Sequence, residues 1–250
     1  MSPEITPNLQ TQSAAVIDWP QPPTNLIFDD EEPLESNRHR VAMNLLIRSF
    51  KHGGTTRQDI FVGGNMFVYY SSEQVKNRDF RGPDFFVVLG VNNDPSRLGW
   101  VVWEEGGRYP DVIVELLSPS TETVDRGIKK DLYEQVFKTR DYFVFDPFNP
   151  GSLQGWHLNL EQGYQPLRPN SRGRLWCEAL GLWLGTWDGT IEGDTATWLR
   201  FYDTLENLVL SPEEFAQQEA ERERQRAEQE RQRAERLAER LRQLGEDPDR

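Results

Sequence analysis

The chain has 250 residues, of which 36% are hydrophobic and one is a cysteine, and its formal net charge is −13. This length favours one core of moderate size with appendages, and the charge is unfavourable for a protein that coats nucleic acid. The single Cys177 excludes an internal disulfide and a cysteine-based zinc site, and no apolar run is long enough for a membrane span, so we expect a soluble protein of the reducing cytoplasm.

Residues 1–33 mix prolines, polar residues and acids without periodicity, which predicts a flexible leader. Residues 34–50 predict an amphipathic helix, and a helical wheel places Glu35 and His39 in or beside its apolar arc, one turn apart. Both side chains have ordinary alternatives. His39 can be a hydrogen-bonded core histidine, and Glu35 a charge that the helix dipole favours.

Three apolar runs predict strands over residues 85–91, 100–104 and 112–117, and the first of them begins directly after Asp84. Because these strands follow one another with short connections, we expect a meander within a mixed sheet. Residues 141–146 predict a further strand. A helix between 112–117 and 141–146 would make a crossover unit, provided that its two strands are parallel.

Two charged residues interrupt apolar patterns in this unit. Glu115 lies within a buried-looking strand, where an unpaired carboxylate costs several kcal/mol. In the following helix, a wheel that starts at Ile128 places Lys129 in the middle of the apolar arc and Lys130 at its margin. Glu115 could instead face water at the strand end, and Lys129 could reach solvent with its long side chain. An ion pair between the two would explain both.

Downstream of residue 155, aromatic residues alternate with Gly, Pro and Asn, which predicts short hairpins that close one side of the core. The tryptophans of this region could stack on bases or sugars, but without a basic context a core role is favoured. They are Trp176, Trp183, Trp187 and Trp198.

Residues 206–250 predict a charged C-terminal helix that begins with a capping box from Ser211 to Glu214. Small and apolar residues recur at heptad spacing, so the helix is either solvated or a weak coiled coil, and it can support a homodimer. Its nearly balanced charge argues against a nucleic-acid arm. The seam consists of Ala220, Ala227, Ala234, Leu237, Leu241 and Leu244.

The blocks GPDFFVV, PDVIVELLSPST, DRGIKKDLY and DYFVFDP, in this order, resemble the Uma-type restriction endonuclease family, which is abundant in cyanobacteria and is a branch of the PD-(D/E)XK nuclease superfamily. The resemblance covers about residues 34–200. It implies an α/β (α+β) fold of the restriction-endonuclease type, in which helices flank a mixed sheet. The implied domain spans residues 34–205, between the leader and the C-terminal helix.

The resemblance also implies a site of two carboxylates and a lysine. Asp84 matches the aspartate of the first motif and Glu115 the acidic residue of the second. The chain departs from the superfamily pattern at Leu117, where a lysine is usual, and Lys129 matches the lysine that replaces it in the family. Asp111 competes with Asp84, but it lies about 13 Å from Glu115 along the same strand, too far to share an ion.

What the resemblance implies for function is an endonuclease that uses Mg²⁺ or Mn²⁺ to hydrolyse nucleic acid, with DNA as the expected substrate. Asp84 and Glu115 would bind the metal, the backbone carbonyl of Leu116 could add a ligand, and Lys129 would orient the attacking water. Glu35 is a further acidic candidate, whereas His39 is a weaker one. The alternative is a non-catalytic interaction protein that uses the core as a scaffold and the C-terminal helix for association.

Overall fold

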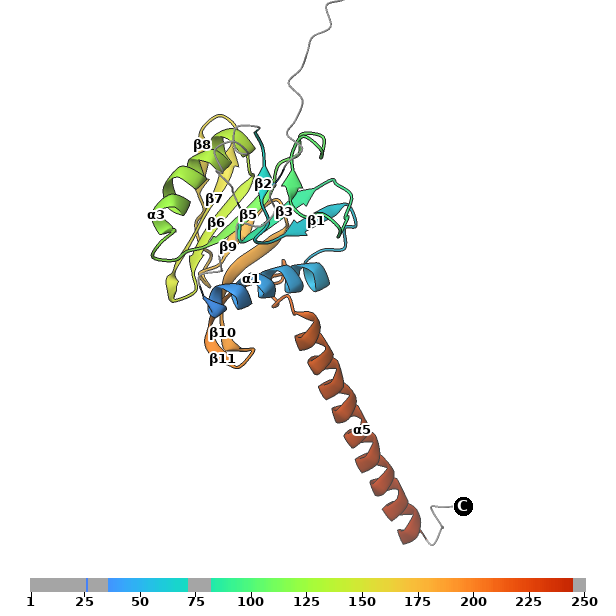
Figure 1. The fold of residues 1–250 in the computed structure, drawn as a ribbon. Coiled ribbons are helices and arrows are strands. Elements are labelled where there is room, and N and C mark those ends of the chain that lie inside the picture. The colour runs from blue at the N-terminus through green and yellow to red at the C-terminus, as the bar shows by residue number, and fades with distance from the viewer. Residues whose placement is uncertain (1–25, 27–35, 72–81, 245–250) are drawn as a thin grey trace, which may run out of the picture.

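The computed structural model describes residues 26, 36–71 and 82–244. Its largest sheet has six strands in the order β1-β3-β5-β6-β7-β8 (Figure 1). β5 and β6 are parallel, whereas the other neighbours are antiparallel, so the sheet is mixed as predicted. The strands are β1 Ile60–Gly63, β3 Phe85–Leu89, β5 Val112–Leu116, β6 Asp141–Asp146, β7 Asn149–Asn159 and β8 Gly163–Pro166.

One continuous helical segment connects β5 to β6 and covers one face of the sheet (Figure 1). It confirms the predicted unit of two parallel strands joined by a helix. Two of its pieces are π-helical turns, which have wider hydrogen-bonded loops than an α-helix. The pieces are α3 Glu122–Val124, η2 Asp125–Lys129, α4 Lys130–Leu132 and η3 Tyr133–Phe137.

The opposite face of the sheet packs against the first helix and a second, three-stranded sheet. The hairpins close one side of the core as predicted. Of the four tryptophans for which a core role is favoured, Trp198 is buried in this layer, whereas Trp176, Trp183 and Trp187 are half-buried. The elements are α1 Asn37–Ser49 with the π-helical turn η1 Phe50–Gly54, β9 Leu175–Cys177, β10 Leu182–Ile191 and β11 Asp194–Tyr202.

The predicted meander is wrong. β3 pairs directly with β5, and the intervening β4 Trp100–Val101 instead pairs in parallel with β2 Val68–Tyr69 in a separate two-stranded sheet. Both edges of β3 are already occupied, by β1 and by β5. The chain also turns sharply after β4, since the N–H of Gly107 donates to the carbonyl of Val102.

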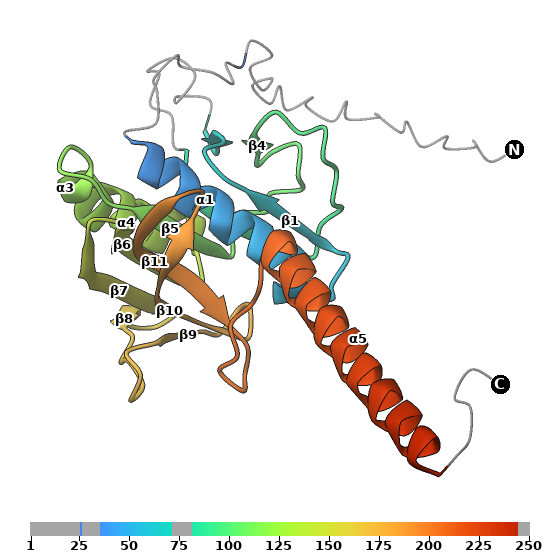
Figure 2. The ribbon, with the colours of Figure 1, turned by 90° about the horizontal axis from the view of Figure 1, so that it is seen from below.

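The C-terminal helix α5 spans Pro212–Gln243 and projects away from the body of the protein (Figures 1 and 2). Its capping box is present: Glu214 N–H donates to Ser211 Oγ over 3.3 Å, and Ser211 N–H donates to Glu214 Oε2 over 2.7 Å. The same Glu214 carboxylate pairs with the buried Arg200 of β11 at 2.6 Å. The first turn of α5 is therefore anchored to the core, whereas most of its later residues whose burial is described are exposed.

Candidate active site

Asp84 and Glu115 lie opposite each other where β3 and β5 meet. Phe85 pairs with Val114, and continuing this antiparallel register by one residue brings Asp84 to Glu115. The Asp84 N–H donates to Glu115 Oε2 over 3.3 Å, and the Leu116 N–H donates to Asp84 Oδ2 over 2.7 Å. Each carboxylate is thus held by the backbone of the neighbouring strand. Both residues face the layer that the crossover helix covers.

Lys129 comes from that helix and joins the site. Its Nζ atom lies 3.1 Å from Glu115 Oε1 and 2.7 Å from Asp125 Oδ1. Tyr133 also donates a hydrogen bond to Glu115 Oε1, over 2.8 Å. Glu115 and Asp125 are buried and the Lys129 side chain is 17% exposed. The structure therefore contains the predicted Glu115–Lys129 pair, within a larger network.

The two π-helical turns determine which side chains point inward. Asp125, Tyr133 and Phe137 are buried, with Lys129 between them, so the inward face repeats every four residues. In a regular α-helix, residues at this spacing drift around the axis by about 40° per step. The wider π turns reduce that drift and keep these side chains in line. The inward position predicted for Lys129 is right.

The apolar arc that led to this prediction was right for Tyr133 and Phe137, which are buried, and for the half-buried Leu132, but it was wrong for two other members. Ile128 is 64% exposed and Val136 is 44% exposed, although the wheel placed both on the buried face. The wheel assumed about 100° of rotation per residue, which the π turns do not follow. Lys130, placed at the margin, lies over the ring of Trp156 at 4.8 Å and takes no part in the network.

Burial and mutual repulsion perturb the acids of the site. Burial, followed by the negative charge of Glu115, raises the pKa of Asp84 well above its usual range. Burial also raises the pKa of Glu115, although Lys129 opposes this effect. Burial lowers the pKa of Lys129, but the charges of Glu115 and Asp125 outweigh it and leave that pKa above the ordinary value. The site thus contains three acids and one cation.

The donor set suits a hard divalent cation. Asp84 and Glu115 present carboxylate oxygens side by side in a buried setting, where an additional positive charge would relieve their repulsion. Within the described part of the chain, no three His, Cys, Asp or Glu side chains converge as a metal-binding group. Mg²⁺ needs no such cage, because it is commonly held by one or two carboxylates and keeps several waters. The residues present therefore fit Mg²⁺ or Mn²⁺.

Other sequence candidates lie elsewhere. Asp111 is at the opposite end of β5, where its carboxylate accepts the Leu89 N–H over 2.8 Å. His39 is buried. Its Nε2 donates to the carbonyl of Leu117 over 3.1 Å, and its Nδ1 lies 2.8 Å from Ser36 Oγ. His39 is therefore a hydrogen-bonded core histidine, which is the ordinary alternative that the sequence allows for it. Glu35, like the predicted leader at residues 1–33 apart from residue 26, lies outside the described residues.

Sequence reasoning missed Asp125 as a member of the site. Its place after the loop of residues 118–121 is typical of a residue near the start of a helix, yet it is buried and paired with Lys129. Its spacing of four residues from Lys129 is the signal that could have identified it, because such residues are neighbours on a helix surface.

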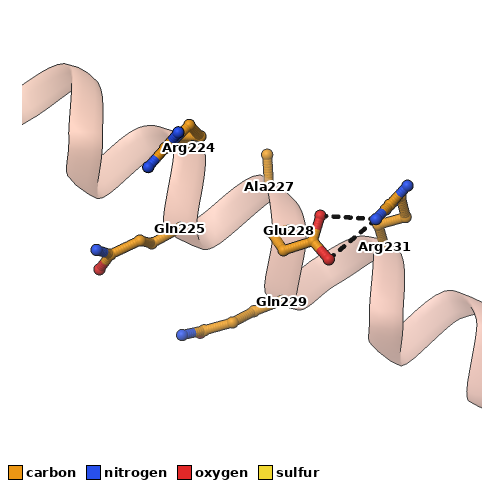
Figure 3. A pocket seen from close by; sticks show the side chains of 6 residues that line it. All are labelled: Arg224, Gln225, Ala227, Glu228, Gln229 and Arg231. Atoms are coloured by element: carbon orange, nitrogen blue, oxygen red, sulfur yellow. Dashed lines mark hydrogen bonds and ion pairs between the residues drawn. The ribbon is translucent and has the colours of Figure 1, made fainter.

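Two surface hollows of the described part of the chain lack a comparable group. One of about 690 Å³ lies along α5 alone, where Glu228 pairs with Arg231 (Figure 3). Another, of about 470 Å³, is lined by residues of β7 to β10 and their loops, and its lining contains no titratable side chain. Neither includes Asp84 or Glu115.

No helix among the described residues is long and apolar enough to cross a membrane.

The comparison with protein families agrees with the sequence resemblance. The family model Uma2, described as "Putative restriction endonuclease", matches residues 17–187, which is more than half of the chain. A crystal structure from Anabaena variabilis, described as "a putative nuclease belonging to DUF820", is similar with a TM-score of 0.40 and 13% identity. The match covers 59% of this chain and 76% of that one. The search of curated proteins gave no match.

Proposed function

Because this chain belongs to the Uma2 family, which is described as "Putative restriction endonuclease", we propose that it is a metal-dependent endonuclease that hydrolyses phosphodiester bonds of nucleic acid. One observation carries the proposal. Asp84 and Glu115 contact each other where β3 and β5 pair, and the same buried Glu115 carboxylate contacts Lys129 from the crossover helix. Two carboxylates beside a lysine are what binding a cation and a phosphate requires.

Asp84 and Glu115 would hold Mg²⁺ or Mn²⁺, with the backbone carbonyl of Leu116 as a further oxygen ligand. When bound, the cation supplies Lewis-acid polarisation of the phosphate and lowers the pKa of a water molecule. The two side chains are preorganised for this task, since backbone N–H groups of the opposite strand already fix their oxygens. Little reorganisation would be needed on binding.

Lys129 would orient the attacking water and neutralise charge that develops on the phosphate. Its ammonium group has three donors, of which the two carboxylates Glu115 and Asp125 engage two. The third donor can face the substrate. Glu35, which precedes α1 in the sequence, is a further acidic contributor in this proposal.

The proposed substrate is DNA, and the proposed compartment is the cytoplasm, with which one cysteine in 250 residues is consistent. Specificity for DNA over RNA would come from residues beyond the metal site. The net charge of −13 predicts weak binding outside that site, because the long-range potential repels phosphates.

A cleavage assay tests the proposal. Purified protein is incubated with plasmid and with single-stranded DNA, in Mg²⁺, in Mn²⁺ and in chelator, alongside Asp84→Ala and Lys129→Ala. We expect metal-dependent cleavage by the wild type and a loss of at least about 100-fold in each variant. Equal cleavage by wild type and variants, or no cleavage with either metal, would contradict it.

A second candidate function is supported by α5, which projects from the core with exposed side chains over most of its length. In this alternative the core is a non-catalytic scaffold, and α5 mediates association, including a homodimer. Sedimentation of the full chain and of a chain that ends at residue 218 would test it. Association that is lost on truncation, together with no metal binding by calorimetry, would favour the scaffold over the enzyme.

A further inference from the structure

Asp125 is a buried acid whose carboxylate does not take part in the Asp84–Glu115 contact. It is 1% exposed, and its Oδ1 lies 2.7 Å from Lys129 Nζ, one helical turn away. A carboxylate is retained in such a place only when a cation compensates for its lost hydration. Lys129 is that cation, so the two residues depend on each other.

The backbone of Asp125 is fixed on the sheet as well as in the helix. Its carbonyl accepts a hydrogen bond from the hydroxyl of Tyr142 over 2.8 Å, and its N–H donates to the Thr121 carbonyl over 2.9 Å. Tyr142 belongs to β6 and is itself buried between Tyr133 and Trp156. Asp125 is therefore a rigid anchor, and its position does not depend on Glu115.

Lys129 faces three acids from three segments: Glu115 on β5, Asp84 directly before β3 and Asp125 on its own helix. The first two are the residues that would hold a cation. A divalent cation attracts their carboxylate oxygens and repels the ammonium group, so it weakens the electrostatic attraction between Glu115 and Lys129. Asp125 pairs with the same ammonium group from its own helix, and among the described residues it belongs to no group of three or more that could hold a metal ion. Its attraction for Lys129 would persist.

We propose that Asp125 is a positioning residue that keeps the Lys129 ammonium group in place when Glu115 engages a cation. The inference rests on the proposed function, and it assigns to Asp125 no contact with metal or substrate. It explains why the helix contains π turns, which align Asp125, Lys129 and Tyr133 toward β5. Asp125 would thus act on catalysis only through the lysine.

The first test uses metal-free protein and needs no activity. A lysine ammonium group held by two buried carboxylates exchanges its protons slowly, so Lys129 should give an observable ¹⁵N–¹H signal, assigned by its absence in Lys129→Arg. We expect Asp125→Asn to remove or shift this signal, and Asp131→Asn, an exposed acid of the same helix, to leave it unchanged. An unchanged signal in Asp125→Asn would overturn the inference.

The second test is a double-mutant cycle. Asp125→Asn should lower turnover by about 10- to 100-fold in the wild-type background but by less than about twofold in Lys129→Met, because its effect passes through the lysine. Mn²⁺ affinity, measured by calorimetry, should be unchanged in Asp125→Asn and reduced in Asp84→Asn. Equal losses of turnover in both backgrounds, or an Mn²⁺ affinity reduced as in Asp84→Asn, would overturn the inference.

The two tests separate this inference from the proposed function. If the wild type cleaves no nucleic acid while the Lys129 signal depends on Asp125, the nuclease proposal fails and the positioning contact remains. If the wild type cleaves but Asp125→Asn is as active as Asp131→Asn, the inference fails and the nuclease proposal remains. Asp125→Glu, which keeps the charge, should recover part of the signal and of the turnover.

Discussion

The N–H of Asp84 lies 3.3 Å from Oε2 of Glu115, although 31 positions separate the two residues in the chain. A second hydrogen bond joins the same segments, because the Leu116 N–H donates to the Asp84 carboxylate over 2.7 Å. An amide at position 84 could still accept that hydrogen bond. The charge of this acid can therefore be removed while the shape of the site is kept.

Asp84→Asn should lower metal-dependent cleavage by at least about 100-fold, because an amide binds a divalent cation more weakly than a carboxylate does. Turnover on plasmid in Mg²⁺ measures the effect. Asp111→Asn is the matched control, since Asp111 also accepts a backbone N–H but lies at the far end of β5. A comparable loss in the control would show that the measurement reports strand stability.

The stability of metal-free protein should depend on pH through Asp84. Burial and the charge of Glu115 raise the pKa of Asp84, so the folded state retains its proton to a higher pH than the unfolded chain does. The free energy of unfolding therefore falls as the pH rises from about 4 through the raised pKa.

Asp84→Asn removes this contribution, so it should stabilise the metal-free protein on the order of 1 kcal/mol more at about pH 8 than at about pH 4. Urea denaturation in chelator at the two pH values measures the difference. A stability change that is the same at both values would contradict the assignment of the titration to Asp84.

Lys129→Met should destabilise the fold by about 3–5 kcal/mol, because it leaves Glu115 and Asp125 buried without their cation. Lys130→Met is the control, since Lys130 only lies over the ring of Trp156 and should contribute about 0.5–1 kcal/mol. Chemical denaturation compares the two variants. Equal effects would mean that the buried network contributes no more than the surface contact.

Tyr133→Phe should cost about 1.5–3 kcal/mol, because the Tyr133 hydroxyl donates to the carboxylate of Glu115. Tyr164→Phe removes a buried tyrosine hydrogen bond of similar length, to the neutral Thr139 carbonyl, and should cost about 0.5–1.5 kcal/mol. Denaturation curves rank the two. The reverse order would indicate that Glu115 is protonated and needs no donor at that pH.

Glu214→Ala should destabilise the core by about 3 kcal/mol or more, since Glu214 both caps α5 and compensates for the fully buried Arg200. Glu213→Ala removes only an exposed pair with Arg48 and should change stability by less than about 1 kcal/mol. Thermal denaturation of both variants tests the contrast. Similar losses of stability in the two variants would mean that residues other than Glu214 anchor α5 to the core.

Local sequence patterns were sufficient to predict several elements of the fold. The β-branched run around Glu115 identified β5, the capping box from Ser211 identified the start of α5, and the family motifs identified the mixed sheet. The meander failed because the edges of β3 are occupied by strands that are distant in sequence. The helical wheel misplaced Ile128 because the helix contains two π turns, whose rotation per residue differs from the fixed value that the wheel assumes.

The sequence by itself determined the chemistry of the site, because a carboxylate in an apolar strand and a lysine on an apolar helix face each require a partner. Only the tertiary structure decided which partners they have. Strand register brings Asp84 to Glu115, and the π turns keep Asp125 and Lys129 on the helix face that points toward β5. Register and helical phase depend on packing between segments far apart in the chain, so local periodicity does not specify them.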